Sequence, residues 1–229
     1  RLNIDYILAQ PAVIDLIIKR AAVVVRRLLV KSNVNVDSQS VNWDGRGDDG
    51  NLTPDAEYTV EIHAAALADE TNTQTEESHV WLDTTPPVIK LGAGLGAYVP
   101  ATTVLLGSVT DKTLVGYQAY IEGPLPNTKR LLLTEGTEAV TDVSLARFSQ
   151  LGLDDARYRI RILASDEAGN ESDFQSEEFE LDSTAPSVSF SNPSPGTFVS
   201  RVQPTQIRGL VEDINLKTVG LDVDGSPVH

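Results

Sequence analysis

The sequence contains no cysteine, so no disulfide can support its fold and no thiol can act as a nucleophile or as a zinc ligand. It also contains no methionine, and no secretory signal peptide is recognisable in it. We therefore expect the sequence to be an internal part of a longer protein. A secreted protein without disulfides must derive its stability from its hydrophobic cores, from bound metal ions, or from both.

Positive charge is scarce, because 18 Lys and Arg residues stand against 33 Asp and Glu residues and give a formal net charge of −15. Binding to nucleic acid requires a basic surface that neutralises phosphates, so we expect no nucleic-acid partner. The same charge works against adhesion to an anionic membrane. An acidic surface instead suits solubility and the binding of divalent cations.

Long apolar runs are missing as well. The most apolar stretch, residues 11–30, is interrupted by the charged side chains Asp15, Lys19, Arg20, Arg26 and Arg27. A membrane-spanning helix needs about 20 consecutive apolar residues, so we expect no membrane insertion. With 229 residues, 41% of them hydrophobic, the chain is long enough for two domains or two and a fraction, each with its own core.

Alternation of apolar and polar residues is the main pattern that is present. It predicts strands whose inner faces carry Leu2, Ile4, Tyr6 and Leu8, then Tyr58, Val60 and Ile62, and later Tyr158, Ile160 and Ile162. Turn dipeptides such as Asp-Gly and Gly-Asn separate these runs. Many short alternating strands with frequent turns predict an all-β fold of packed sandwiches.

Residues 12–30 are compatible with either an amphipathic helix or a β-hairpin. Pro11 and the β-branched run at residues 23–25 favour two strands, although no glycine stands between the two halves to form the turn.

A repeat of about 100 residues runs through the chain. The segment Leu82-Asp83-Thr84-Thr85-Pro86-Pro87-Val88 returns as Leu181-Asp182-Ser183-Thr184-Ala185-Pro186-Ser187-Val188. Three further segments return at nearly the same distance. Tyr58-Thr59-Val60-Glu61-Ile62 returns as Tyr158-Arg159-Ile160-Arg161-Ile162, and Gly96-Ala97-Tyr98-Val99 returns as Gly196-Thr197-Phe198-Val199. Gly107-Ser108-Val109-Thr110-Asp111 returns as Gly209-Leu210-Val211-Glu212-Asp213. Tandem modules are therefore predicted at 1–85, at 86–183 and, incomplete, at 184–229. The word module refers to these three ranges below.

Two resemblances to known families follow from specific motifs. Residues 1–85 resemble the immunoglobulin-like domain typified by the flagellar hook-capping protein, through the loop Val41-Asn42-Trp43-Asp44-Gly45-Arg46-Gly47-Asp48-Asp49-Gly50-Asn51, Pro54 and the strand Glu57-Tyr58-Thr59-Val60. Residues 86–229 resemble the immunoglobulin-like repeats of bacterial surface proteins and adhesins, through Ala164-Ser165-Asp166-Glu167-Ala168-Gly169-Asn170 and the two Asp-x-x-Pro-type joints. These resemblances imply tandem immunoglobulin-like β-sandwiches that act as spacers or display scaffolds, in some adhesins with calcium at the joints.

No catalytic residue is predicted. His63, His79 and His229 stand in no motif of a hydrolase or a metalloprotease, so we expect the chain not to be an enzyme. Trp43 and Tyr58 are interpreted as core anchors, whereas Trp81 is expected near a joint and partly exposed. The triplet Arg46-Gly47-Asp48 is interpreted as a chance occurrence of an integrin-type motif.

Calcium is the cofactor that the acidic residues suggest, because it takes six to eight oxygen ligands. Five aspartates are expected near the module joints. Asp83 and Asp182 end their modules, Asp166 stands in the loop before the last strand, and Asp111 and Asp213 follow the second strand. A weaker candidate is the loop with Asp44, Asp48, Asp49 and Asn51. In both places the alternative is that the side chains only hydrogen-bond local backbone donors.

The sequence thus favours a structural or spacer segment of a large secreted or cell-surface bacterial protein, outside the cell. Its partners would be other domains of the same long chain or neighbouring protein subunits. Two alternatives stay open: an adhesin-type binding module for glycan or protein, and an accessory region of a large secreted enzyme or toxin.

Overall fold

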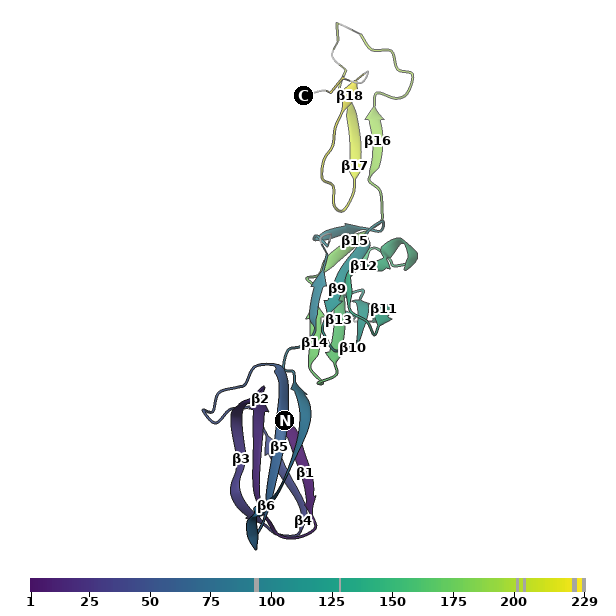
Figure 1. Ribbon diagram of the computed structural model, residues 1–229. Helices are drawn as coiled ribbons and strands as arrows, with labels where there is room; N and C mark the ends of the chain where they lie inside the picture. The colour runs from purple at the N-terminus through teal and green to yellow at the C-terminus, as the bar shows by residue number, and fades with distance from the viewer. Residues whose placement is uncertain (93–94, 128, 201, 204, 224–225, 228–229) are drawn as a thin grey trace. The chain divides into compact units, whose positions relative to one another are not determined.

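The computed structural model describes residues 1–92, 95–127, 129–200, 202–203, 205–223 and 226–227. Contacts between residues divide the chain into two units, Arg1–Pro86 with Glu167–Asn170, and Pro87–Asp166 with Glu171–His229. The described residues form β-strands and a short 3-10 helix, η1 (Phe148–Gln150), which confirms the predicted all-β class (Figure 1). They contain no helix that is long and apolar enough to cross a membrane.

The first unit consists of two packed antiparallel sheets. A four-stranded sheet has the order β3-β2-β5-β6, and a two-stranded sheet pairs β1 with β4. The strands are β1 (Leu2–Leu8), β2 (Ala12–Arg20), β3 (Val23–Val34), β4 (Asp37–Trp43), β5 (Ala56–Ala66) and β6 (Asp69–Leu82). The predicted alternation places Ile14, Leu16 and Ile18 of β2 in the core, where Leu2 and Ile4 of β1 pack against them.

Residues 12–30 are the hairpin β2–β3, so the helical alternative was wrong. The turn lies at Ala21 and Ala22, and Ala21 has a φ of 52°. A left-handed backbone angle at a non-glycine residue explains how the turn forms without the glycine that sequence reasoning looked for.

The second unit contains a six-stranded sheet facing a three-stranded one. The larger sheet has the order β11-β10-β13-β15-β8, with β14 also paired to β13, and the smaller has the order β12-β9-β7. The strands are β7 (Val88–Leu91), β8 (Tyr98–Pro100), β9 (Val104–Thr110), β10 (Leu114–Glu122), β11 (Arg130–Gly136), β12 (Val140–Arg147), β13 (Ala156–Asp166), β14 (Glu171–Gln175) and β15 (Phe179–Asp182). Buried side chains from both sheets, including Val109, Ile160 and Ile162, form one core.

The described residues between 187 and 227 contain two pairs of short antiparallel strands. The first pairs β16 (Ser187–Asn192) with β17 (Arg208–Glu212), and the second pairs β18 (Asp222–Val223) with β19 (Ser226–Pro227). Two strands offer too little surface to bury both faces of a sandwich, and Val188, Phe190 and Leu210 of the first pair lie largely exposed.

Candidate functional site at the module ends

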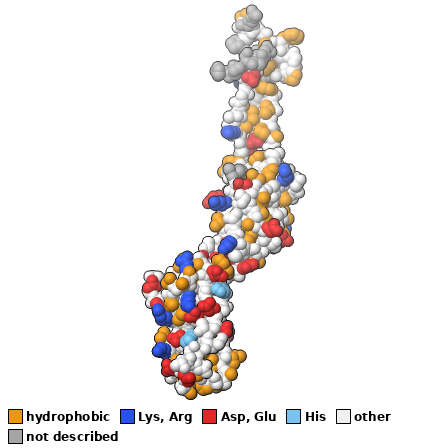
Figure 2. Space-filling model, in the orientation of Figure 1, with side chains coloured by type: hydrophobic (Ala, Val, Ile, Leu, Met, Phe, Trp, Pro, Cys, Tyr) orange, Lys and Arg blue, Asp and Glu red, His pale blue; other side chains and the backbone are white. Residues whose placement is uncertain are grey.

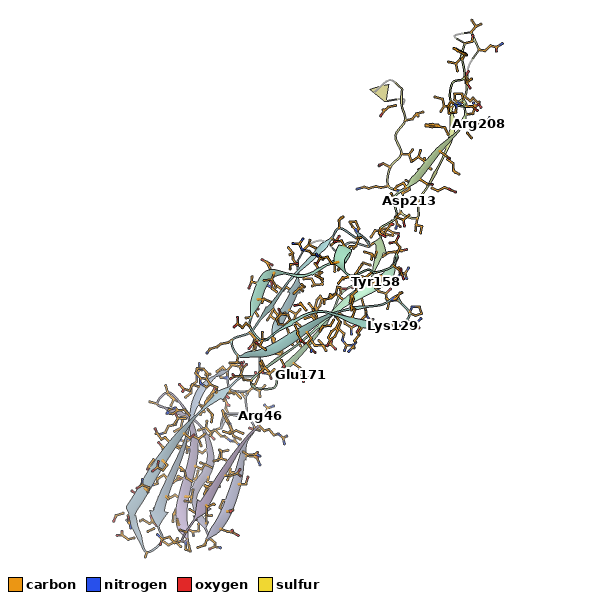
Figure 3. The ribbon with its side chains drawn as sticks, turned by 90° about the vertical axis from the view of Figure 1, so that its right-hand side faces the viewer. Arg46, Lys129, Tyr158, Glu171, Arg208 and Asp213 are labelled. Atoms are coloured by element: carbon orange, nitrogen blue, oxygen red, sulfur yellow. The ribbon has the colours of Figure 1, made fainter. Side chains whose placement is uncertain are left out.

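Tyr58 and Tyr158 anchor equivalent corners of the first two modules. Both rings are buried, and Figure 3 shows Tyr158 among the interior side chains of the second unit. The Tyr58 hydroxyl donates to the carbonyl oxygen of Pro54 at 2.6 Å, and the Tyr158 hydroxyl donates to that of Asp154 at 3.0 Å. In each case the acceptor stands four residues upstream, so the buried ring fixes the loop that leads into its strand.

The residue after each of these carbonyls is an aspartate that binds the end of its own module. The carboxylate of Asp55 accepts hydrogen bonds from the hydroxyls of Thr84, at 2.8 Å, and Thr85, at 2.6 Å. The carboxylate of Asp155 accepts from the backbone N–H of Ser183 at 2.7 Å and from the hydroxyls of Ser183 and Thr184, both at 2.5 Å. We call these two arrangements the module-end latches.

The hydrogen bonds of the latches lower the pKa of both carboxyl groups. Hydrogen bonds from Thr85 and then Thr84 lower the pKa of Asp55 from its ordinary value. Those from the hydroxyls of Ser183 and Thr184 lower the pKa of Asp155 in the same way. The charged form of each carboxylate therefore favours the closed latch.

Asp83 and Asp182 cap the connector that follows each module. Asp83 accepts the backbone N–H of Thr85 at 3.0 Å, and Asp182 accepts that of Thr184 at 3.1 Å. These are the local hydrogen bonds that the sequence offered as the alternative to metal binding. In addition, the side-chain amide of Asn170 donates to the carbonyl oxygen of Asp83 at 3.2 Å, within the first unit.

Asp111 and Asp213 also occupy equivalent turns. Asp111 accepts the backbone N–H of Thr113 at 2.8 Å, and Asp213 accepts that of Asn215 at 2.7 Å. Asp111 follows β9, which is the third strand of its module because the short strand β8 precedes it. The Asn215 side chain donates to the carboxylate of Asp182 at 3.0 Å. The turn of Asp213 therefore lies next to Asp182, another of the predicted metal ligands.

Asp166 lies at the end of β13, not in a loop as expected, and its residue is only 4% exposed. A carboxylate oxygen of Asp166 lies within 4.8 Å of one of Asp111. Two carboxylates at this distance repel each other, and burial increases the repulsion. Within the second unit, Asp111 and Asp166 are thus the two predicted metal-ligand carboxylates that the structure brings together.

The loop of residues 44–51 uses its polar side chains internally. Asp44 accepts the backbone N–H of Arg46 at 3.1 Å, and Asp49 accepts that of Asn51 at 3.0 Å and its side-chain amide at 2.9 Å. Asp48 accepts both the backbone N–H and the guanidinium of Arg27, at 2.9 and 2.7 Å. These contacts hold the Arg46-Gly47-Asp48 triplet inside the loop rather than presenting it as a free tip.

The aromatic residues lie where the sequence predicted. Trp43 is buried and contacts Tyr58 edge-on, with ring centroids 5.1 Å apart, and its indole N–H donates to the carbonyl oxygen of Arg46 at 2.9 Å. Trp81 is exposed at the end of β6.

Among the histidines, His63 lies in β5 with Nδ1 2.9 Å from the hydroxyl of Thr75, and His229 falls outside the described residues.

Sequence reasoning missed Asp55, Asp155 and Glu122. The first two had a signal in the sequence, because Asp55-Ala56-Glu57-Tyr58 returns as Asp155-Ala156-Arg157-Tyr158. Each aspartate stands three residues before the tyrosine that begins a repeated segment.

Glu122 had no such signal in the sequence. It is 1% exposed and accepts hydrogen bonds from the guanidiniums of Arg130 and Arg159, each at 2.8 Å. Burial raises the pKa of Glu122, but these two partners outweigh it and the pKa is lowered.

No protein-family model matches this chain, and no curated protein matches its sequence. The resemblance to immunoglobulin-like modules therefore stays a prediction from the motifs, and the geometry of the module ends carries the functional argument.

Proposed function

We propose that this chain is a structural spacer of a large secreted or cell-surface protein, built from tandem immunoglobulin-like modules and without catalytic activity. The observation that carries the proposal is the pair of module-end latches. In two successive modules, an aspartate three residues before the anchoring tyrosine binds the connector at the module's end. A site repeated with its module suits a mechanical role at every joint better than recognition of one ligand.

The immunoglobulin-like assignment has support in the tyrosine contacts. Both modules consist of two sheets facing each other across one core, with antiparallel pairing except between β15 and β8 of the second module. Both also carry a tyrosine whose hydroxyl binds a carbonyl four residues upstream. A tyrosine corner of this kind is a hallmark of the immunoglobulin fold.

The proposed mechanism is restriction of the connector. Each latch fastens the residues that follow a module's last strand to the body of that module, which leaves few rotatable residues before the next strand. Pro86, Pro87 and Pro186 then fix φ in the remaining connector. Fewer free dihedrals reduce the bending of one module against the next, so attached domains are held at a more uniform distance.

The test is a distance distribution between spin labels. Because the chain has no cysteine, Thr73→Cys and Leu132→Cys introduce two unique labelling sites on exposed strands of the first two modules. In the doubly labelled chain, Asp55→Ala should broaden the distribution clearly, since it opens the latch between them. Asp155→Ala should not, because its latch follows the second module.

Asp69→Ala is a further control for Asp55→Ala. Asp69 also accepts local hydrogen bonds, from the backbone N–H and hydroxyl of Thr71, but at the start of β6. An unchanged width in Asp55→Ala, or equal broadening in Asp69→Ala, would refute the mechanical role of the latch.

Calcium at the joints is the second part of the proposal. The available donors fit this ion, because they are oxygen atoms only and carboxylates predominate among them. On the second unit's side of the first joint these are Asp111 and the buried Asp166. At the second, the turn of Asp213 and Asn215 adjoins Asp182, and the Asn215 side-chain oxygen is buried without a hydrogen-bond partner among the described residues. An unpartnered buried oxygen is a costly feature that a cation would relieve.

The calcium test is a melting curve with added CaCl2 and with a chelator. A ligand that binds only the folded state adds about 2.7 kcal/mol to the free energy of unfolding at a hundredfold excess over Kd, so we expect an increase of several degrees in Tm. Asp111→Asn should reduce this increase, whereas Asp48→Asn should leave it unchanged. Equal melting with calcium and with chelator would exclude the ion and leave the latch proposal standing.

A further inference from the structure

Four neighbouring strands of the larger sheet in the second unit surround a hollow on the side of the sheet that faces away from the core. The central strands β10 and β13 provide its floor, and β11 and β14 on either side of them provide its walls. The hollow has a volume of about 900 Å³, and small residues on the floor, such as Gly116 and Ser165, leave this space open. Figure 3 shows Glu171 at the start of β14, where one wall begins. We call this hollow the sheet trough.

Polar side chains in the sheet trough hold one another in place. The Gln118 amide donates to the carboxylate of Glu135 at 3.0 Å, and its oxygen accepts the hydroxyl of Tyr120 at 2.8 Å. On the opposite side, the Arg161 guanidinium donates to both carboxylate oxygens of Asp173, at 2.8 and 2.6 Å. Side chains fixed in this way are pre-organised, so a ligand would lose little affinity in ordering them.

This polar network is not part of the framework that the modules repeat. The repeat aligns Arg159 and Arg161 with Thr59 and Glu61, so the charge at the second position is reversed in the first module. There Glu61 pairs with Lys19 of the neighbouring strand. The latches, by contrast, occur in both modules. A feature found in only one of two aligned modules points to a task of that module rather than to a requirement of the fold.

The sheet trough presents hydrogen-bonding groups of both kinds beside an apolar surface. The carboxylates of Glu135 and Asp173 accept hydrogen bonds, the amide of Gln118 also donates them, and the hydroxyl of Ser165 does both. Leu163 adds an aliphatic side chain to the floor. A sugar ring matches this combination, because its hydroxyls donate and accept around the edge while its C–H groups form apolar faces.

The charges in the sheet trough disfavour an anionic ligand. The Arg161 guanidinium already faces two carboxylates, Asp173 and the buried Glu122, which lies 3.5 Å away. Glu135 and Glu171 add two further carboxylates to the walls. The chain as a whole carries a net charge of −15, and Figure 2 shows acidic side chains on the visible face of the second unit. Acidic polysaccharides and nucleic acids would therefore be repelled.

We propose that the sheet trough binds an uncharged polysaccharide along the outer face of the second module. The backbones of β10 and β13 are paired with strands on both sides, so an extended peptide cannot add to them by strand pairing. Recognition there depends on the polar side chains, which suit the hydroxyls of sugars. This binding goes beyond the spacer function and does not depend on the latches.

Affinity electrophoresis of the full chain tests the proposal. Gels are prepared with four uncharged polymers, an α-glucan, a β-glucan, a mannan and a galactan, and with the acidic polymer polygalacturonate. At least one uncharged polymer should slow the migration of the chain, and polygalacturonate should not. Gln118→Ala and Asp173→Ala should each raise the dissociation constant about tenfold or more. Glu177→Ala, which removes an exposed carboxylate outside the sheet trough, should change it by less than about twofold.

Nuclear magnetic resonance locates the site without relying on a variant. In a titration with a hexasaccharide of the polymer that slows migration, the backbone amide signals of Gly116, Leu163 and Ser165 should change most. Melting curves of the variants check that they are folded. Three results would overturn the proposal: no retardation by any of the four uncharged polymers, stronger retardation by polygalacturonate, or signal changes confined to strands outside the sheet trough.

Discussion

The hydroxyl of Thr184 lies 2.5 Å from the carboxylate of Asp155, a residue 29 positions earlier in the chain. The same relationship joins Thr85 to Asp55 at 2.6 Å. Both acceptors precede a strand at the centre of their module, and both donors follow its last strand. Each contact therefore attaches the departing chain to the most buried part of the module that it leaves.

Stability should depend on pH through these two carboxylates. Their pKa is lowered in the folded protein, so between the ordinary value of about 3.9 and the folded value the folded state binds fewer protons than the unfolded chain. Their contribution to the free energy of unfolding should be complete above about pH 5 and should be lost as the pH falls through the folded pKa. Urea unfolding of the wild-type chain between pH 7 and pH 3 measures this loss.

The variant Asp55→Asn should weaken that pH dependence, because an amide cannot change its charge. Asp5→Asn is the matched control, since Asp5 is an exposed carboxylate on β1 outside the latch. If the two variants show the same slope between pH 5 and pH 3, the latch does not contribute to the acid sensitivity.

The tyrosine corner should account for a measurable part of each module's stability. Tyr58→Phe and Tyr158→Phe keep the buried ring and remove only the hydroxyl that binds the upstream carbonyl. A hydrogen bond of this kind contributes about 1 kcal/mol, which corresponds to a decrease of about 4–8 °C in Tm for a module of this size. Calorimetry should show the decrease in both variants and not in Tyr98→Phe, whose hydroxyl-bearing ring is exposed.

Glu122 should be the carboxylate whose loss is most costly in the second module. Glu122→Gln keeps the volume of the side chain but removes the charge that the guanidiniums of Arg130 and Arg159 contact. Hydrogen bonds to charged groups contribute about 1.5–3 kcal/mol each, so we expect a loss of at least that size. Chemical denaturation measures it, and Glu135→Gln on the neighbouring strand β11 should change the stability by less than about 0.5 kcal/mol.

Ala21 is a site where a substitution should stabilise the first module. At a φ of 52°, alanine is strained by about 1–2 kcal/mol, which glycine would avoid. Glycine also adds conformational entropy to the unfolded chain, which lowers the free energy of unfolding by about 0.4–1 kcal/mol. Ala21→Gly should therefore raise the free energy of unfolding by about 0.5–1 kcal/mol, and a lowered Tm would contradict the strain. Ala22→Gly, in the same turn, should not be stabilising.

The strands and the aromatic anchors could be predicted from the sequence because each depends on a local pattern. Alternation identified the inner faces around Ile160 and Tyr58, and a tryptophan before a turn indicated the burial of Trp43. Asp55 and Glu122 could not be recognised in the same way. Their partners stand 8–37 residues away, and an acidic residue in a turn or strand does not by itself indicate which donors the fold brings to it.

The turn at Ala21 shows a different limit. Glycine is the usual sign of a left-handed turn residue, and where alanine takes its place the pattern gives no indication of the turn. Only Pro11 and the β-branched run at residues 23–25 favoured two strands over a helix, and the pairing of β2 with β3 settled the choice.

In both latches the aspartate, the tyrosine beside it and the Ser or Thr hydroxyls all precede the first strand of the next module. A gene segment that encodes one module therefore also encodes the fastening of its own exit. Duplication or deletion of such a segment would change the number of modules without requiring compensating mutations in the neighbours. The number of modules can in this way change in evolution while the construction of every latch stays the same.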